Sequence, residues 1–441
     1  MRFEAMTDVI GNTPLVRIDP EVHGLRHIDL YAKMELLSPF GSLKDRAAWA
    51  MVRPHLAAAA ERGDTVVELS SGNTAKALAV IAGMHGLSFT SVTHRMKVPE
   101  IKDLLLVLGA EIEELPGQAE CLDPTSTDDP LTRMHQSLAA TGTGYVHTDQ
   151  YFNPLNAGAH QDGTGPEIIQ DLEGRAPDYF IACVGTAGSS TGVAAALRRQ
   201  DPGVQVIGLV AEKADFIPGI RNLDEVHEVG LFDPDVYDAI ETISSDDAID
   251  GLLTLVRRCG TLAGPTGGGA YQGAVRHLRA VDAELTERRT AVFIVCDRVE
   301  SYMSYLRERR PELFGQPPRR HSLQTLTPAE LAQASSQAID VARAQAWQAE
   351  RSGLIVDLRS TYAYQALHIE GSVNIVDEVF ADLLHGGLPF GRNQPVLLVC
   401  PVGEKSVGYA ALLTRMGHRD VRSLSGGIIA WRDAGAALVR D

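Results

Sequence analysis

The sequence predicts a protein built from parallel α/β units and divided into more than one domain. The chain has 441 residues, which is too long for one compact hydrophobic core. Short runs rich in β-branched residues alternate with segments rich in alanine and leucine, and this repetition is typical of a parallel sheet with helical connections. The pattern stops at a basic stretch that contains three prolines and then resumes, which indicates a second α/β unit.

The strands of the first part are predicted from short apolar runs. These runs lie at 65–70, 89–94, 179–185, 205–212 and 291–297. Helical patterns lie between some of them, at 74–86 and 101–110. Strand, helix and strand in repetition predict the parallel sheet.

The stretch YLRERRPELFGQPPRRHS (305–322) lacks a core pattern and is the predicted linker region. Beyond it, short apolar runs at 353–359, 395–400 and 420–426 predict the second unit. We therefore divide the chain into a first domain at 1–310, a linker at 311–324 and a second domain at 325–441.

Composition excludes several classes of partner. The formal net charge of −17 repels nucleic acid and anionic membrane surfaces, so we expect neither as a partner. The five cysteines are few and widely spaced, which supports neither a disulfide framework nor a metal site. The first residues lack the apolar run of a signal peptide, and no apolar segment approaches the roughly 20 residues of a membrane span. We expect a cytoplasmic protein.

A lysine at the start of a predicted helix is the first candidate for chemistry. In SPFGSLKDRAAWAMV (38–52), Gly41 and Ser42 form a turn and Lys44 begins the helix. The positive end of a helix disfavours a cation, which would lower the pKa of Lys44 and help it act as an amine nucleophile. The alternative is an ordinary solvated lysine.

Two glycine-containing loops between a strand and a helix strengthen the first interpretation. In ELSSGNTAKALAV (68–80), hydroxyl, amide and backbone donors gather at a helix N-terminus, which is a ready anion site. In CVGTAGSSTGVAAAL (183–197), a glycine-rich turn can wrap a phosphate, although it has neither Walker nor dinucleotide-binding spacing. We call the loop in 68–80 the carboxylate-type loop and the loop in 183–197 the phosphate-type loop. A lysine at a helix start, followed along the chain by these two loops in this order, is a more specific signal than any of the three alone.

Over about residues 1–310 the chain resembles the cysteine synthase / cystathionine β-synthase family. These are pyridoxal-phosphate (PLP) enzymes of fold type II, the two-subdomain tryptophan synthase β-like fold. The motifs that carry the resemblance stand in the family's order: IGNTPLVRI (10–18), GSLKDRA (41–47), SSGNTA (70–75), DQYFNPLNAGAH…TGPEI (149–168), GTAGSSTG (185–192) and GPTGGGAYQGA (264–274).

The resemblance implies a role for each motif. Lys44 would carry PLP as a Schiff base, and Asn73 would hydrogen-bond the ring hydroxyl of the cofactor. Thr266 would face the pyridine nitrogen; a turn hydroxyl is the alternative. The cofactor phosphate would be held by Gly185, Thr186, Ala187, Gly188 and Ser189. The substrate α-carboxylate would be bound by Ser70, Ser71, Thr74 and Gln150.

Lys76 departs from the family pattern. A cation in the first turn of a helix opposes the helix dipole and needs compensation. Our hypothesis is that Lys76 meets an anionic group of the amino-acid substrate, either a second carboxylate or a phosphate. The alternative is that Lys76 points into solvent.

Over about residues 325–441 the chain resembles the rhodanese family, a small parallel α/β fold. The matching motifs are LIVDLRSTYAYQALHIEGSVNI (354–375), VLLVCPVGEKS (396–406) and LSGGIIAWRDAG (424–435). The family's loop points backbone N–H groups at the sulfur, which would stabilise a thiolate or persulfide at Cys400. Lys405 replaces the usual arginine and lacks its bidentate grip on an anion, so a degenerate docking domain is the alternative.

Together the two resemblances imply a cytoplasmic enzyme that makes cysteine or a related sulfur amino acid. Lys44 would remove the α-proton of O-acetylserine or O-phosphoserine, the β-substituent would leave to give an aminoacrylate, and sulfur held at Cys400 would be added. The alternatives are synthesis of 2,3-diaminopropionate or β-cyanoalanine, with the rhodanese domain as a non-catalytic interaction module. The resemblance also implies a homodimer, and a sulfur-carrier protein is a possible partner.

Overall fold

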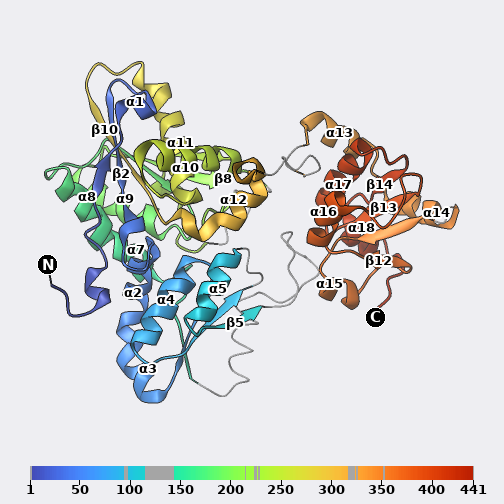
Figure 1. Ribbon diagram of the computed structural model, residues 1–441, viewed down its shortest axis with the longest axis horizontal. Helices are drawn as coiled ribbons and strands as arrows, with labels where there is room; N and C mark the ends of the chain where they lie inside the picture. The colour runs from blue at the N-terminus through green and yellow to red at the C-terminus, as the bar shows by residue number, and fades with distance from the viewer. Residues whose placement is uncertain are drawn as a thin grey trace. The chain divides into compact units, whose positions relative to one another are not determined.

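The computed structural model describes residues 2–93, 98–114, 144–213, 215–222, 226, 229–315, 323, 326–350 and 353–440. Among these, the residues up to Arg310 form one compact unit and those from Pro311 onward form a second (Figure 1). Both units are mixed α/β structures with largely parallel sheets, which confirms the predicted fold class. Cys121 lies outside the described residues.

The larger sheet of the first unit has the strand order β1-β2-β10-β7-β8-β9. Its strands are β1 (Leu15–Arg17), β2 (Ile28–Lys33), β7 (Tyr179–Cys183), β8 (Gln205–Ala211), β9 (Ala239–Ile243) and β10 (Arg289–Ile294). β1 runs antiparallel to β2, and the other neighbours are parallel. All residues of β7 are buried, as expected for a parallel strand covered on both faces.

Helices cover both faces of this sheet (Figure 1). α10 (Ser245–Cys259) and α11 (Pro265–Asp282) pack on the face that buries Ile181 and Leu209. α8 (Gly165–Asp171) and α9 (Gly188–Gln200) pack on the face that buries Phe180 and Val206. Alternate residues of the same strands therefore serve two separate cores.

The smaller sheet of the first unit has the order β5-β4-β3-β6, and all its neighbouring pairs are parallel. Its strands are β3 (Thr65–Leu69), β4 (Phe89–Thr93), β5 (Glu111–Glu114) and β6 (Tyr145–His147). Its main helices are α2 (Lys44–Val52), α4 (Asn73–Met84) and α5 (Pro99–Val107). Shorter helices of the unit are α1 (Pro20–His23), α3 (Leu56–Arg62), α7 (Pro154–Ala159) and α12 (Met303–Arg309).

The second unit contains a parallel sheet of order β12-β11-β13-β14. Its strands are β11 (Leu354–Asp357), β12 (Ser372–Asn374), β13 (Val396–Val399) and β14 (Val421–Ser423). Its helices are α13 (Pro328–Ser336), α14 (Val341–Glu350), α15 (Thr361–Ala366), α16 (Asp377–Gly386), α17 (Glu404–Arg415) and α18 (Gly427–Asp433). β13 is fully buried, and Cys400 follows it directly.

Part of the predicted linker is helical. Pro311–Phe314 forms a short 3-10 helix, η8, in which Pro311 is buried. Residues 316–322, 324 and 325 lie outside the described residues. Within the part of the chain that the structure describes, no helix is both long and apolar enough to cross a membrane.

A buried ion cluster fixes the helix that begins at Lys44. Arg46 of α2 donates to both oxygens of Glu35, at 2.7 and 2.9 Å, and to both oxygens of Glu167 on α8, each at 2.7 Å. Lys33, at the end of β2, lies 3.0 Å from Glu167 Oε2 and 3.1 Å from Asp171 Oδ2. Burial raises the pKa of Glu167, but the hydrogen bonds and charges of Arg46 and Lys33 outweigh it and lower that pKa to about 2.

We predict that Glu167→Gln lowers the unfolding free energy of the first unit by about 3 kcal/mol at pH 7, because it leaves two buried cations undercompensated. The pKa of Glu167 falls from 4.5 to about 2 on folding, so its contribution is present above pH 4.5 and is lost as the pH falls towards 2. Urea denaturation at several pH values measures the difference.

Asp171→Asn on the same helix is the matched control, since the Asp171 side chain is 36% exposed and, within the described residues, forms an ion pair with Lys33 alone. We expect this variant to lose less than about 1 kcal/mol. Equal losses in the two variants would contradict the central place of Glu167 in the cluster.

Candidate active site

The turn before α2 places Lys44. Gly41 has a positive φ of 86°, which favours glycine, and its N–H donates to Ser38 O at 2.8 Å. Ser42 Oγ accepts from Lys44 N at 3.2 Å, and Leu43 N donates to Cys296 O at 2.8 Å. The helix therefore starts at Lys44, as predicted, against the strand end that follows β10.

The amine of Lys44 points at the glycine-rich loop that follows β7. Lys44 Nζ donates to Thr186 Oγ1 at 3.2 Å. Burial lowers the pKa of Lys44, while Cys296 and Asp297 oppose the shift. The direction agrees with the expectation from the sequence, but its main physical cause is burial. An amine with a lowered pKa is a better nucleophile and base near neutral pH.

The loop at 185–189 has the shape of an anion cradle. Ala187 adopts a left-handed conformation with φ 59°, and α9 begins at Gly188 with no capping side chain at its N-cap. A Cβ on Gly185 would lie 2.6 Å from Gly219 O, and one on Gly188 would lie 2.2 Å from Asn156 Oδ1. The loop therefore needs glycine at both positions, and it presents first-turn N–H groups that have no acceptor within the helix.

The carboxylate-type loop after β3 joins this cradle through two side chains. Thr74 Oγ1 donates to Gln150 Oε1 at 2.7 Å, and Gln150 Nε2 donates to Leu69 O at 3.0 Å. Asn156 Nδ2 donates to Gln150 O at 2.7 Å and to Thr186 Oγ1 at 3.0 Å. The three predicted loops therefore meet.

The two serines of this loop lie at its turn, and both are partly buried. Ser70 Oγ accepts from Gly72 N at 3.3 Å and from Ala75 N at 3.4 Å, which holds the turn before α4. Ser71 follows it in the same turn. Ser189 is buried in the first turn of α9, beside the cradle.

Asn73 is engaged by residues that sequence reasoning missed. Its Nδ2 donates to Asp297 Oδ2 at 2.6 Å and to Tyr302 Oη at 3.1 Å. Tyr302 also donates to Asp297 Oδ2. Asn73 Oδ1 is buried and, among the described residues, has no hydrogen-bond partner. The end of the predicted strand 291–297 was the available signal for Asp297, because ligand sites lie at the carboxyl ends of parallel strands.

Thr266 lies buried in the first turn of α11. Its Oγ1 donates to Pro218 O at 2.8 Å, and its backbone oxygen accepts from Cys183 Sγ at 3.4 Å. The hydroxyl proton is therefore committed to the backbone in this geometry. A role opposite a pyridine nitrogen stays a prediction.

Lys76 is buried rather than exposed, with 7% of its surface accessible. This argues against the alternative in which it points into solvent. A Cβ built on Gly41 would lie 3.8 Å from Lys76 Nζ, so the ammonium faces the turn that precedes Lys44. Burial lowers the pKa of Lys76, opposed by Asp297 and Asp45. Neither carboxylate comes within ion-pair distance in the described part of the chain.

Two further residues support Gln150 and were missed from the sequence. Glu68 is fully buried at the end of β3 and accepts from Thr148 Oγ1 at 2.5 Å and from Gln150 N at 3.2 Å. Burial raises the pKa of Glu68 to about 7. Asn156 lies inside the DQYFNPLNAGAH motif, but nothing in its local pattern distinguishes it from a helix-capping residue.

In the second unit, Cys400 lies on the loop between β13 and α17, as predicted. Gly403 N donates to Cys400 Sγ at 3.1 Å, and Ser406 Oγ lies 3.3 Å from the same sulfur. Only 1% of Cys400 is exposed. Lys405 Nζ, which replaces the usual arginine, lies 2.7 Å from Asp377 Oδ2, so its charge is directed to that carboxylate.

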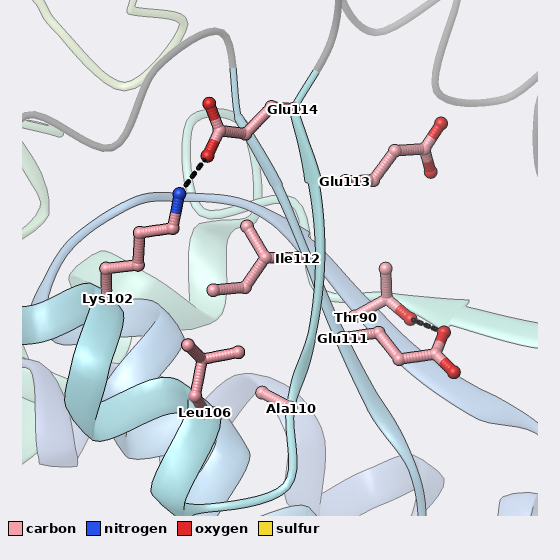
Figure 2. A pocket seen from close by; sticks show the side chains of 8 residues that line it. All are labelled: Thr90, Lys102, Leu106, Ala110, Glu111, Ile112, Glu113 and Glu114. Atoms are coloured by element: carbon pink, nitrogen blue, oxygen red, sulfur yellow. Dashed lines mark hydrogen bonds and ion pairs between the residues drawn. The ribbon is translucent and has the colours of Figure 1, made fainter.

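A surface hollow of about 620 Å³ lies elsewhere, beside the edge strand β5. Figure 2 shows that it is lined by residues of α5, β4 and β5, with Lys102 reaching Glu114 at 2.5 Å across it. None of the predicted site residues lines this hollow. It therefore does not define the active site.

Comparison with known proteins agrees with this arrangement. Residues 6–297 match the family described as pyridoxal-phosphate dependent enzyme, and residues 340–434 match the rhodanese-like domain. Cysteine synthase B of Pseudomonas aeruginosa is 32% identical over 305 residues, covering 69% of this chain and 97% of the relative. Cysteine synthase B of Salmonella typhimurium is 33% identical over 309 residues, covering 68% and 95%.

Solved structures show the same fold. An O-acetylserine dependent cystathionine β-synthase from Helicobacter pylori has a TM-score of 0.58 and 26% identity, covering 69% of this chain and 98% of its own. An O-ureido-L-serine synthase has a TM-score of 0.60 and 26% identity, covering 72% and 100%. These findings confirm the predicted fold type and cofactor. The chain belongs to the cysteine synthase family of pyridoxal-phosphate-dependent, β-replacing enzymes and carries a rhodanese-like domain after its catalytic part.

Proposed function

We propose that the first unit replaces the β-substituent of an activated serine with sulfur, and that Lys44 is its central residue. One observation carries this proposal. Asn156 Nδ2 joins Gln150 O and Thr186 Oγ1, and Lys44 Nζ reaches the same Thr186 Oγ1. The amine, the phosphate-type loop and the carboxylate-type loop therefore form one hydrogen-bonded constellation.

The residues present fit PLP. Gly185 and Gly188 pack against Gly219 O and Asn156 Oδ1, where a Cβ would lie at 2.6 and 2.2 Å, and this fixes the turn. The first-turn N–H groups of α9 that follow the turn have no acceptor within the helix and can bind a phosphate. Lys44 has a pKa lowered by burial, which favours the neutral amine. When bound, PLP supplies an electron sink for the α-carbon of the substrate, so that a β-substituent can leave.

Different residues of the chain then remove the proton, bind the substrate and hold the cofactor. Lys44 Nζ takes the α-proton as general base. The loop at the N-terminus of α4, with Ser70, Ser71, Thr74 and Gln150, binds the substrate α-carboxylate through its donors. Residues 185–189 would hold the cofactor phosphate. Thr266 would face the pyridine nitrogen, where a neutral hydroxyl would leave that nitrogen without a charged partner.

The relatives support a serine derivative and a sulfur nucleophile. By their names, the Helicobacter pylori enzyme is O-acetylserine dependent and the bacterial relatives are cysteine synthases. The O-ureido-L-serine synthase is named for a different product, so the nucleophile varies within the fold. The attached rhodanese-like domain favours sulfur for this chain.

We predict that the purified protein converts O-acetylserine or O-phosphoserine and sulfide into cysteine. Lys44→Ala should lower the rate by about 10²–10⁴-fold or more, because it removes the base. Product mass spectrometry measures this, with ammonia and cyanide supplied in parallel reactions. Lys102→Ala, a surface lysine, is the control. Faster formation of 2,3-diaminopropionate or β-cyanoalanine would contradict the sulfur assignment.

Lys76 directs the choice of leaving group towards phosphate. A buried cation without a close partner is unfavourable, and an anionic ligand beside it restores the balance. The Gly41 turn faces both Lys76 Nζ and Arg298, whose Cδ would lie 3.6 Å from a Cβ built there. The cations therefore border the turn that places Lys44. The phosphate of O-phosphoserine, on the oxygen attached to the β-carbon, supplies negative charge that can balance Lys76. The acetyl group of O-acetylserine is neutral and does not.

We predict that Lys76→Met lowers kcat/KM for O-phosphoserine by about 10–100-fold, the range of one charge-assisted hydrogen bond. The value for O-acetylserine should change by less than threefold. Steady-state kinetics with both substrates measures the ratio, and Lys102→Met is the matched surface control. Equal effects on the two substrates would exclude a contact between Lys76 and the leaving group.

Cys400 is the sulfur-handling residue of the second unit. Its thiolate attacks the outer sulfur of thiosulfate, the sulfur–sulfur bond breaks, and sulfite leaves with its electron pair. Two molecules of a small thiol then reduce the resulting persulfide, which releases sulfide, regenerates the thiol of Cys400 and joins the two small thiols in a disulfide. The N–H of Gly403 stabilises the anionic sulfur. Fusion of the units raises the local sulfide supply where the linker allows transfer.

The buried state of Cys400 and the pairing of Lys405 with Asp377 favour the docking-module alternative. The donor must reach a sulfur that is almost fully covered, and the cation that would bind it is engaged elsewhere. In that alternative, the domain recruits a sulfur-carrier protein and Cys400 is not needed for turnover.

We predict that Cys400→Ser lowers the rate of thiosulfate-fed relative to sulfide-fed cysteine formation by at least tenfold, in the presence of a small thiol. Mass spectrometry of the products measures this ratio. Cys259→Ser, a partly buried cysteine of α10, is the matched control. An unchanged ratio in Cys400→Ser would support the docking module instead.

A further inference from the structure

The side-chain amide of Asn73 has no donor to spare. Its nitrogen carries two hydrogens, and these go to Asp297 Oδ2 at 2.6 Å and Tyr302 Oη at 3.1 Å. Tyr302 uses its only hydrogen on Asp297 Oδ2, so it can only accept from Asn73. Asp297 Oδ2 therefore receives two donors, which fits an ionised carboxylate. The atom of Asn73 without a partner among the described residues is the acceptor Oδ1.

This arrangement conflicts with the role that the family resemblance implies for Asn73, a hydrogen bond to the ring hydroxyl of PLP. A hydrogen bond to the ring oxygen of PLP requires a donor when that oxygen is ionised, and Oδ1 can only repel it. Rotating the amide by about 180° would turn Nδ2 towards the cofactor. Oδ1 would then face Asp297, which is tolerable only if that carboxyl group carries a proton.

We propose that Asp297 is a positioning residue that takes up a proton from solvent when PLP binds. The protonated carboxyl group then donates a hydrogen bond to Asn73 Oδ1. Asn73 Nδ2 is thereby turned towards the ring oxygen of the cofactor. The inference rests on the proposed function, because it requires Asn73 to face PLP. No covalent bond changes, and the proton is the only species exchanged.

The surroundings of Asp297 favour this uptake. Burial raises the pKa of Asp297, while Tyr302, Lys76, Asn73 and Lys44 oppose the shift. Cys296 precedes Asp297 in the chain, and Cys183 of β7 lies within its electrostatic reach. PLP brings negative charge to the site, and a like charge nearby disfavours the ionised carboxylate further. Asp297 Oδ1 lies against Gly264, where a Cβ would come within 2.1 Å.

The experiment compares the full-length apoprotein with an Asp297→Asn variant. Isothermal calorimetry of PLP binding at pH 8, in two buffers of different ionisation enthalpy, counts the protons exchanged. We expect the wild type to take up close to one proton more than Asp297→Asn. At pH values above the pKa that Asp297 has in the apoprotein, the wild-type Kd for PLP should rise by up to about tenfold per pH unit. This rise should be steeper than that of the Asp297→Asn variant. Glu300→Gln, a carboxylate paired with Arg298, is the control and should match the wild type.

A second variant keeps the test informative if Asp297→Asn does not fold. Tyr302→Phe removes a hydrogen bond that stabilises the ionised form of Asp297, so the rise in Kd should begin at a higher pH. Equal proton counts and superimposable Kd profiles in wild type and variants would overturn the inference. If Asn73→Ala left the affinity for PLP unchanged, the assignment of Asn73 to the cofactor would fail instead.

Discussion

The arrangement of the active site depends on the buried ion cluster around Arg46. Lys44 and Arg46 lie in the first turn of one helix, so the position of the guanidinium sets the position of the Lys44 amine. Glu35 and Glu167 hold that guanidinium from two other elements through four hydrogen bonds. Gly11 and Gly163 pack closely against it, since a Cβ on either would lie 3.0–3.1 Å from Arg46 Nη1.

Such an ion cluster fixes the position of α2 and of Lys44, and this effect is clearer than any gain in the free energy of unfolding. A buried ion pair often adds little net stability over an apolar replacement, but removing one partner is strongly unfavourable because a charge is left uncompensated. Rotation or sliding of α2 would have the same consequence, because Arg46 would lose its carboxylates. The helix is therefore held in one register, and Lys44 Nζ is held against Thr186.

The two units share one arrangement of the backbone at the end of a strand. In each, a buried parallel strand ends in a turn rich in small residues, and a helix follows. In the first unit Gly185 and Gly188 let the turn pack closely against Gly219 O and Asn156 Oδ1. In the second unit the turn closes around its own cysteine, because Gly403 N and Ser406 Oγ already contact Cys400 Sγ. Access to Cys400 therefore requires local movement of the loop.

Local sequence determined the elements and the loops that carry chemistry. Buried strands such as β7, the start of α2 at Lys44 and the turns after β3, β7 and β13 follow from patterns within a few residues. The order of the motifs also determined the family, the fold and the cofactor. Tertiary structure alone decided which partner each polar group meets. Asn73 meets Asp297 across 224 residues, Thr186 meets Lys44 across 142, and Lys405 turns to Asp377 across 28. These pairings could not be predicted because a buried donor takes whichever acceptor packing brings within about 3 Å, and packing brings together residues that are distant in the chain.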